Sequence, residues 1–283
     1  MTVVDSPAGP KLERLDGLLS GLPGAVVAFS GGVDSSFLAF VANRVLGNRA
    51  VAITADSPSL ARSELEEARA FARAYGIHHR VVATIELEDS RYTRNAPDRC
   101  SFCKESLMEA LLSLPEAAVS EVLLGVNVDD LGDHRPGQAA ALRRGARFPL
   151  VEAGLSKAEI RSLSRTLGLP TWDKPAAACL ASRIAYGVPV TEGALRRVER
   201  AEDAFRTLGF KGQVRVRDQG GDLARIEVSA GDFDRLLAKR DEVVRAIKAA
   251  GFLFVTLDLE GYRMGSHNIP LRLGRRPGRD IGG

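Results

Sequence analysis

The sequence predicts an α/β protein in which a doubly wound parallel sheet is followed by a smaller α/β domain. Apolar strands alternate with amphipathic helices from about residue 12 to residue 169. The first apolar run, Ala25–Phe29, leads into the turn Ser30–Ser36, which is rich in glycine and hydroxyl groups and precedes a helix. Such a turn is typical of phosphate binding, because glycines let several N–H groups face one anion.

Composition excludes several classes of protein. The chain has 283 residues, 45% of them hydrophobic and 27% charged, which is enough for the cores of two domains. A net charge of +3 is mild, so a nucleic-acid partner is not expected. The sequence has neither a membrane-spanning apolar run nor the basic and apolar start of a signal peptide, which predicts a cytoplasmic protein without membrane contact. Three cysteines, an odd number, argue against a disulfide framework.

The other elements of the first domain follow from their apolar periodicity and their end signals. Gly76 follows one predicted helix as a C-terminal cap, and Ser156 with Glu159 forms a capping box at the start of another. The predicted strands cover residues 50–55, 79–83 and 121–125, and the predicted helices cover 37–46, 59–75, 101–114, 138–144 and 157–167.

A second domain follows a segment without periodicity. Residues 172–189 are rich in Pro, Ala and Gly and are predicted to form a functional loop. Beyond them the pattern predicts helices at 191–208 and 232–250 and strands at 213–217, 223–228 and 252–257. The predicted domains are therefore 1–189 and 190–270, and the glycine-rich tail, 271–283, is predicted to be disordered.

A nucleotide site is predicted at the carboxyl edge of the first sheet. In open parallel sheets, ligands bind beyond the carboxyl ends of the strands, so the loops after three strands should meet there. Asp34 among phosphate-binding groups implies a compensating cation, for which Mg²⁺ is the natural choice. Asp129 is interpreted as a ligand of ribose, adenine or magnesium, or as a solvated acid. The predicted nucleotide-binding residues are Ser30, Gly31, Gly32, Val33, Asp34, Ser35, Ser36, Thr54, Asp56, Gly125, Asn127 and Asp129.

The cysteines form two clusters with the basic surroundings that favour thiolates. Cys100 and Cys103 form a C-x-x-C pair at the start of a helix, which could bind one metal centre or be incidental or redox-paired thiols. Cys179 lies in the loop between Lys174 and Arg183, where a reactive thiolate is favoured over simple packing.

Charged residues near and beyond Cys179 are candidates for substrate binding. Arg215 and Arg217 alternate on a predicted strand and so share a face, next to Arg225 on the neighbouring strand. They suit a substrate phosphate, with a solvated strand face as the alternative. The predicted substrate-binding residues are Ser182, Arg183, Arg215, Arg217 and Glu202, with Asp203 as a further candidate.

Together these motifs carry a resemblance to a known family. The run SGGVDSS resembles the PP-loop of ATP pyrophosphatases, although the lysine of a Walker A loop is absent. With NAPDRCSFCK, GVNVDDLGDHRPG, PAAACLASRIAYG and VRVRDQGGDLARIEV, nearly the whole chain resembles the LarE family of ATP-dependent sulfur transferases. The resemblance implies that ATP adenylates the carboxylates of pyridinium-3,5-biscarboxylic acid mononucleotide, which become thiocarboxylates for the nickel-pincer nucleotide cofactor of lactate racemase.

The resemblance also implies roles for individual residues. Cys179 matches the essential cysteine of the family, and Arg215 and Arg217 match phosphate ligands of the mononucleotide. The presence of Cys100 and Cys103 resembles the type in which three cysteines hold a [4Fe-4S] cluster, leaving one iron open to hydrosulfide. In single-cysteine members, the cysteine gives up its own sulfur and becomes dehydroalanine. The resemblance also implies a homo-oligomer, a hexamer that is built through the second domain. The sequence does not identify the source of the sulfide.

Three other functions remain open from the sequence. A PP-loop tRNA thiolation enzyme also combines this loop with cysteines, but a basic, aromatic-rich extension for RNA is not found. An amidotransferase-type synthetase that uses ammonia would leave the cysteines unexplained. A nucleotide-binding regulator without catalysis would require Cys179 to be dispensable.

Overall fold

The chain folds as two compact units. The computed structural model describes residues 8–132, 136–175 and 178–269, so the predicted disordered tail lies outside the described residues. The first unit comprises Met1–Glu86 and Cys100–Ala177, and the second comprises Leu87–Arg99 and Ala178–Gly283.

This division differs from the predicted boundary at residue 189. The segment that starts at Ala178 already belongs to the second unit, together with the distant segment Leu87–Arg99. The side-chain amide of Asn95, which is fully buried, joins these two segments. It donates hydrogen bonds to three carbonyls of residues 184, 185 and 188, at 3.2, 2.9 and 2.8 Å. A contact between residues so far apart in the chain is invisible to local periodicity.

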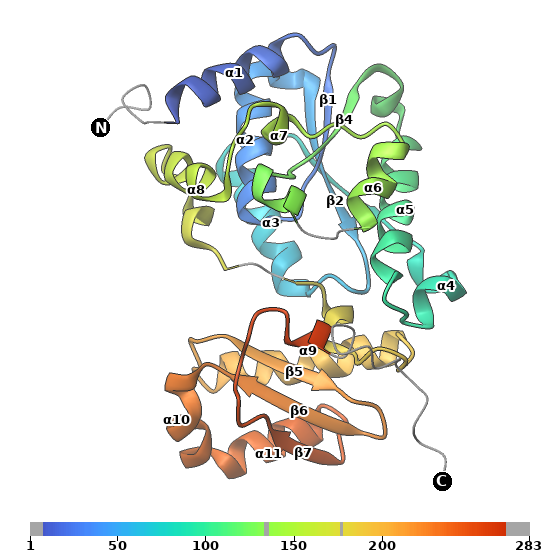
Figure 1. Cartoon of the computed structure of the whole chain (residues 1–283), viewed down its shortest axis with the longest axis vertical. Helices are drawn as coiled ribbons and strands as arrows, with labels where there is room; N and C mark the ends of the chain where they lie inside the picture. Colours follow the sequence, from blue (N-terminus) through green and yellow to red (C-terminus); the bar gives the residue numbers. More distant parts are fainter. Residues whose placement is uncertain (1–7, 133–135, 176–177, 270–283) are drawn as a thin grey trace. The chain divides into compact units, whose positions relative to one another are not determined.

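The first unit contains a parallel sheet of four strands (Figure 1). Their order is β3-β2-β1-β4, and each neighbouring pair is parallel, so the predicted doubly wound sheet is confirmed. β2 and β4 lie on opposite sides of β1, so the order in which the chain adds strands to the sheet reverses beside β1. Ligands of α/β sheets bind at such a point of reversal. The strands are β1 Ala25–Ala28, β2 Ala50–Asp56, β3 His79–Ala83 and β4 Glu121–Leu124.

Helices cover both faces of this sheet. Val26 and Val27 are neighbours on β1 and point to opposite faces, and each packs into a different hydrophobic cluster. Val27 packs with Leu38 of α2, whereas Val26 packs with Met108 of α5. The helices are α1 Gly9–Ser20, α2 Val33–Leu46, α3 Arg62–Ala74, α5 Arg99–Leu112, α6 Pro136–Arg143, α7 Pro149–Glu152 and α8 Lys157–Thr166.

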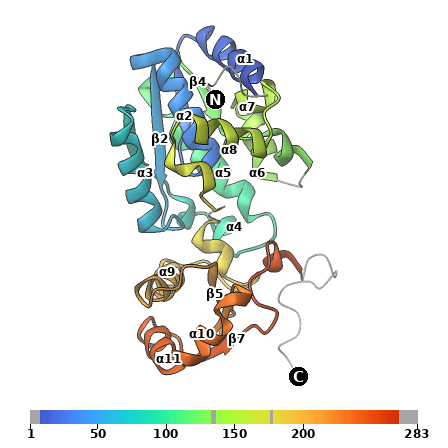
Figure 2. The ribbon, with the colours of Figure 1, turned by 90° about the vertical axis from the view of Figure 1, so that its left-hand side faces the viewer.

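The second unit has a mixed sheet of three strands in the order β5-β6-β7. β5 and β6 are antiparallel, and β6 and β7 are parallel. Figure 2 shows α9 and α11 on one side of this sheet. The predicted helix at 232–250 is interrupted at Lys239, whose angles (φ −100°, ψ 19°) depart from the helix. The elements are α4 Ser90–Thr93, α9 Glu192–Thr207, β5 Val214–Asp218, β6 Leu223–Val228, α10 Phe233–Ala238, α11 Arg240–Ala249 and β7 Phe254–Leu257.

The strand register separates an apolar face of this second sheet from a charged one. Val216 lies opposite Ile226, and both are buried. Arg217 lies opposite Arg225 on the other face, one residue along each strand. The charged face thus comes from the alternation that the sequence predicted.

Across residues 8–132, 136–175 and 178–269, none of the helices combines the length and the hydropathy that crossing a bilayer requires.

Candidate active site

The turn after β1 is closed by its own serines. The Ser35 hydroxyl accepts a hydrogen bond from the Ser30 backbone N–H at 3.2 Å and donates to the Gly32 carbonyl, also at 3.2 Å. Gly31 has φ +72°, and a Cβ there would lie 3.2 Å from the Cβ of Ala68 on α3. Glycine is therefore needed at Gly31 for both conformation and space.

Two polar atoms at the start of α2 are buried without a partner among the described residues. They are Oδ1 of Asp34 and Oγ of Ser36. Buried polar atoms are normally hydrogen-bonded, and both lie in the first turn of a helix, where backbone N–H groups attract anions. Both atoms are therefore candidates for contact with a ligand. The side chain of Val33, by contrast, is buried in the hydrophobic core, and nucleotide contact by Val33 stays a prediction.

Gly125, directly after β4, lies against the backbone of this turn. A Cβ at Gly125 would be 2.9 Å from the Ser35 nitrogen and 3.0 Å from the Asp34 carbonyl carbon. The loops after β1 and β4 therefore touch through their backbones, as the winding of the sheet predicts.

Replacing Gly125 by alanine should damage nucleotide binding. The added methyl group would displace backbone atoms of the phosphate-binding turn, at a cost of about 1–3 kcal/mol. We expect weaker ATP binding by isothermal titration calorimetry and a lower melting temperature. Gly17→Ala is the matched control, because a Cβ at Gly17 on α1 meets nothing within 4 Å. Unchanged ATP affinity in Gly125→Ala would contradict this close-packed arrangement of the two loops.

The loop after β4 is connected to α8 by side chains. The Asn127 amide oxygen accepts the N–H of Asp129 at 3.0 Å, and the Asp129 carboxylate accepts the N–H of Lys157 at 2.8 Å. Asn127 is buried, so the amide holds the loop in a fixed turn. Asp129 is thus a partner of the first residue of α8, and not only a solvated acid.

The predicted residues on β2 have partners inside the first unit. The buried Thr54 hydroxyl donates to the Phe29 carbonyl at 2.7 Å and lies 2.8 Å from Nε2 of His79. The Asp56 carboxylate accepts from the Arg62 guanidinium at 2.5 Å. Nucleotide contact by Thr54 or Asp56 stays a prediction.

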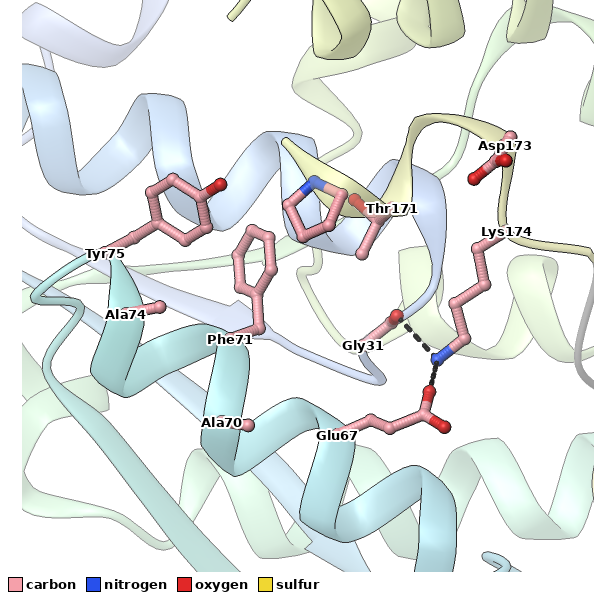
Figure 3. Close-up of a pocket in the computed structure, with 10 residues that line it drawn as sticks. Gly31, Glu67, Ala70, Phe71, Ala74, Tyr75, Thr171, Asp173 and Lys174 are labelled. Carbon is pink, nitrogen blue, oxygen red and sulfur yellow. Dashed lines mark hydrogen bonds and ion pairs between the residues drawn. The ribbon is translucent and has the colours of Figure 1, made fainter. Parts of the chain in front are cut away.

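Lys174 contacts the phosphate-binding turn, which its place in the sequence did not predict. Its ammonium group donates to the Gly31 carbonyl at 3.1 Å and to Glu64 and Glu67 on α3 at 2.7 and 2.8 Å. Figure 3 shows Lys174 between Gly31 and Glu67. All three residues line a cavity of about 510 Å³. Burial lowers the pKa of Lys174, but the two glutamates outweigh it and raise the pKa above its usual value. Lys174 therefore remains charged and fixes one peptide of the turn.

The three cysteines are divided between the units. Cys100 and Cys103 are three residues apart on α5 of the first unit, so their side chains share one face of the helix. Cys179 belongs to the second unit and is exposed, so the interpretation as buried packing is wrong. Within the described part of each unit, no group of three or more His, Cys, Asp or Glu side chains forms a metal site.

Arg183 and Ser182 hold the backbone around Cys179. The Arg183 guanidinium donates to the carbonyls of residues 178 and 179 at 2.6 and 3.2 Å, and the Ser182 hydroxyl donates to the Cys179 carbonyl at 2.7 Å. Glu202 on α9 pairs with Arg183 through both carboxylate oxygens, at 3.0 and 3.1 Å. These predicted residues therefore support the loop of Cys179, whereas Asp203 pairs with Arg206 on the exposed side of α9.

The two arginines of β5 have different surroundings. Arg217 is buried, pairs with Glu227 at 2.7 Å and donates to the Ser182 carbonyl at 3.0 Å. Arg215 lies over the ring of Tyr262, with 5.1 Å between the guanidinium carbon and the ring centroid. Burial, together with the charge of Arg183, lowers the pKa of Arg215. Among the described residues, Arg215 has no ion pair with a carboxylate.

His267 belongs to the same positive region, and no motif of the sequence predicted it. Burial and the charges of four nearby arginines lower the pKa of His267 to about 3, so the imidazole is neutral. Its Nε2 is buried without a hydrogen-bond partner among the described residues. The arginines that depress this pKa are Arg217, Arg99, Arg225 and Arg183.

Comparison with known proteins decides the family. A family model described as asparagine synthase matches residues 24–119, from the start of the first strand past the C-x-x-C pair. Pyridinium-3,5-bisthiocarboxylic acid mononucleotide synthase of Lactiplantibacillus plantarum is 35% identical over 263 residues, which cover 92% of this chain and 95% of that protein. The chain belongs to the LarE family.

Two further relatives are also similar to this chain. An uncharacterized protein of Synechocystis is 49% identical over 261 residues, covering 91% of this chain and 97% of that protein. An NH(3)-dependent NAD(+) synthetase of Mannheimia succiniciproducens is 27% identical over 167 residues, covering 56% of this chain and 66% of that protein. The resemblance predicted from the motifs is confirmed, and as a LarE protein this chain is an ATP-dependent, adenylating sulfur transferase.

Proposed function

We propose that the protein converts the carboxylates of pyridinium-3,5-biscarboxylic acid mononucleotide into thiocarboxylates for nickel-pincer cofactor synthesis. A carboxylate oxygen attacks the α-phosphorus of ATP, the bond to the β-phosphate oxygen breaks, and pyrophosphate leaves. A sulfur nucleophile then attacks the acyl carbon, and AMP leaves with the oxygen. The observation that carries the proposal is an exposed Cys179 on an arginine-held loop, in a chain that also has a phosphate-binding turn.

ATP is placed at the turn Ser30–Ser36 in this proposal. The helix N-terminus and the glycines supply N–H groups for the departing pyrophosphate. Oδ1 of Asp34, which is buried without a partner among the described residues, fits a magnesium ligand. Mg²⁺ bound with ATP would neutralise phosphate charge, and Asp34 would hold it.

Arg215 is the favoured contact for the phosphate of the mononucleotide. The guanidinium is part-buried, and it has no ion pair with a carboxylate among the described residues. A phosphate would supply that missing charge through charge-assisted hydrogen bonds. A phosphate contact of Arg217 stays a prediction, because Glu227 and Ser182 bind two nitrogens of its guanidinium while its Nε is buried without a partner among the described residues.

For the sulfur step we favour a [4Fe-4S] cluster on Cys100, Cys103 and Cys179. The donor set fits, because cubane clusters are held by cysteine thiolates and three of them leave one iron position open. The thiols of Cys100 and Cys179 are exposed, and Cys103 shares a helix face with Cys100. When bound, the cluster would carry an extra sulfide, taken from a separate source, and deliver it to the adenylated carboxylate. The alternative is the same reaction with Cys179 as the sacrificial donor.

The second unit also supports the proposed homo-oligomer. It exposes several large apolar side chains, among them Phe254 on the edge strand β7, with 62% of its surface accessible. Exposed apolar groups of this size are typical of contacts between protein chains. The hexamer and the cytoplasmic location stay predictions.

Substrate dependence of pyrophosphate release tests the function. We expect release from ATP when pyridinium-3,5-biscarboxylic acid mononucleotide is added, because adenylation needs its carboxylate as the nucleophile. Release is measured with a coupled pyrophosphatase and phosphate assay, and the product is identified by mass spectrometry. Nicotinamide mononucleotide, which keeps the ribose phosphate but has no free carboxylate, is the control substrate.

Transfer RNA is the second arm of that experiment. Release stimulated by tRNA alone would reject the proposal in favour of the tRNA thiolation enzyme. Release with the mononucleotide but no thiocarboxylate, in the presence of a sulfide source, would restrict the protein to adenylation.

A further inference from the structure

We propose that Glu86 is a positioning residue for the adenosine part of ATP. Through the hydroxyl group of Ser57 it fixes the loop that follows β2, and this loop receives the adenosine. The proposal rests on the proposed function only in that ATP binds at the carboxyl edge of the first sheet.

The end of β2 forms a short strand edge beside the phosphate-binding turn. Among the described residues, the last pair between β1 and β2 joins Ala28 and Ile53, whereas β2 continues to pair with β3 as far as Asp56. The Thr54 hydroxyl donates to the carbonyl of Phe29, which directly precedes the turn, at 2.7 Å. Backbone N–H and C=O groups on a strand edge can pair with another group, here the adenine ring. With its phosphates on the turn, ATP would therefore place its adenosine over this edge of β2.

Ser57 directly follows the edge and organises the loop beyond it. Its hydroxyl accepts the N–H of Ser59 at 3.0 Å, and its carbonyl accepts the N–H of Leu60 at 2.9 Å. The Arg62 guanidinium donates to the same carbonyl at 2.9 Å. A serine hydroxyl that binds the backbone two residues on holds a turn in one conformation. The shape of the loop after β2 therefore depends on how this hydroxyl is oriented.

Glu86 orients the hydroxyl of Ser57. The Ser57 hydroxyl donates to Oε1 of Glu86, which lies three residues beyond β3. The two side chains meet because Asp56 lies opposite Ala83, so that β2 and β3 end at the same level. A hydroxyl has one proton, and the carboxylate binds it, which leaves a lone pair of the oxygen for the N–H of Ser59. The hydrogen bond to Glu86 thus sets the conformation of the loop.

The stability of the fold does not account for this carboxylate. Glu86 is only 2% exposed. Its second oxygen, Oε2, is buried without a hydrogen-bond partner among the described residues. A buried polar atom without a partner costs free energy, and an apolar side chain of similar size would avoid that cost. The orientation of Ser57 is the contribution that an apolar residue could not make.

Binding of AMP, and of pyrophosphate with Mg²⁺, tests this role. We expect Glu86→Leu to weaken AMP binding about 10-fold in calorimetry, as loss of one hydrogen bond to a charged group predicts. Pyrophosphate binding should stay unchanged, since the turn Ser30–Ser36 is closed by its own serines. Glu86→Gln, whose amide oxygen still accepts the Ser57 proton, should keep most of the AMP affinity. The melting temperature of Glu86→Leu should not fall, because the unpartnered oxygen is removed.

Ser57→Ala tests the other partner of this hydrogen bond. It should weaken AMP binding as much as Glu86→Leu does. The double variant Ser57→Ala with Glu86→Leu should bind AMP no more weakly than either single variant, because both changes remove the same hydrogen bond.

Glu66→Leu is the matched control. Glu66 on α3 is 63% exposed and pairs with Arg69 at 2.7 Å, so this change also removes one carboxylate and one polar contact. It should leave the affinities for AMP and pyrophosphate unchanged.

Four results would overturn the assignment of Glu86. They are wild-type AMP affinity in Glu86→Leu, equal weakening of AMP and pyrophosphate binding, an AMP affinity of Glu86→Gln as low as that of Glu86→Leu, and additive losses in the double variant. The last would mean that Glu86 acts through a contact of its own.

The unaltered protein separates this inference from the proposed function. Binding of pyrophosphate without binding of AMP would overturn this inference alone, and binding of neither would overturn the proposed function as well. Failure on the pyridinium mononucleotide, with AMP and pyrophosphate binding intact, would overturn only the proposed substrate.

Discussion

Replacing Cys179 by serine will abolish thiocarboxylate formation and leave substrate-dependent pyrophosphate release in place. Cys179 is exposed, on a loop whose backbone Arg183 and Ser182 hold, and the predicted phosphate-binding turn belongs to the other unit. Loss of an essential sulfur group costs at least about 10³-fold in rate, as for other catalytic groups. Quantification of AMP, pyrophosphate and thiocarboxylate in the same reaction separates the two steps.

The same variant distinguishes the two sulfur routes. With a cluster, anaerobically reconstituted protein should contain about four iron and four sulfide per chain. Serine at Cys100, Cys103 or Cys179 should abolish that content, because each thiolate is a ligand. If Cys179 is instead the sacrificial donor, the mass of the unaltered protein should fall by that of hydrogen sulfide in one turnover, and the loss should be located at Cys179.

Ser101→Ala is the control for this series, because Ser101 lies between the two cysteines on α5 without offering a thiolate. It should retain both iron and activity. An intact cluster in all three serine variants would reject these cysteines as its ligands, and full thiocarboxylate formation by Cys179→Ser would reject both routes.

Replacing Glu227 by glutamine should produce the largest loss of stability. Glu227 is fully buried and pairs with Arg217 at 2.7 Å and Arg225 at 3.2 Å. Its Oε atoms also lie 3.3 Å from the Ser266 hydroxyl. Without the carboxylate, the buried guanidinium of Arg217 would lose its charge partner, whereas Arg225 would keep its ion pair with Asp258 at 2.8 Å. Breaking one buried ion pair in this way costs about 3–5 kcal/mol of unfolding free energy.

Urea unfolding, followed by two spectroscopic signals, measures the loss of stability in each of the two units. The chain has one tryptophan, Trp172, which belongs to the first unit, whereas far-UV circular dichroism reports on both units. We expect Glu227→Gln to shift part of the dichroism transition to lower urea and to shift the fluorescence transition less. Glu242→Gln is the matched control, since Glu242 pairs with Lys239 at 3.3 Å on the surface. A loss below about 1 kcal/mol, the value for a surface pair, would contradict the role of Glu227.

Local features of the nucleotide site were predictable from the sequence. The turn Ser30–Ser36 follows a strand and opens a helix, as its glycines and serines indicate, although α2 begins at Val33 and so includes part of the turn. Two strands, β3 and β6, have the predicted bounds at 79–83 and 223–228. The capping box at Ser156 was also correct. Each of these depends on contacts between residues a few positions apart.

The contacts that assemble the site were not predictable. Lys174 was interpreted as a neighbour of Cys179, yet its ammonium group donates to the Gly31 carbonyl, 143 residues away. Asn95 was part of a cysteine motif, yet its amide joins two segments of the second unit. Arg217 was assigned to a phosphate from its face of the strand, but that face also carries Glu227, with which it pairs.

The sequence by itself determined the alternation of strands and helices, the phosphate-binding turn and the thiols, because periodicity and turn chemistry are local properties of the chain. Only the tertiary structure decided which charges meet. Lys157, Lys174, Glu202 and Glu227 find partners through the packing of elements, and a charged residue looks the same in sequence whether it is solvated or paired. Burial makes these pairings selective, since an unpaired buried charge is costly, and burial is a property of the fold.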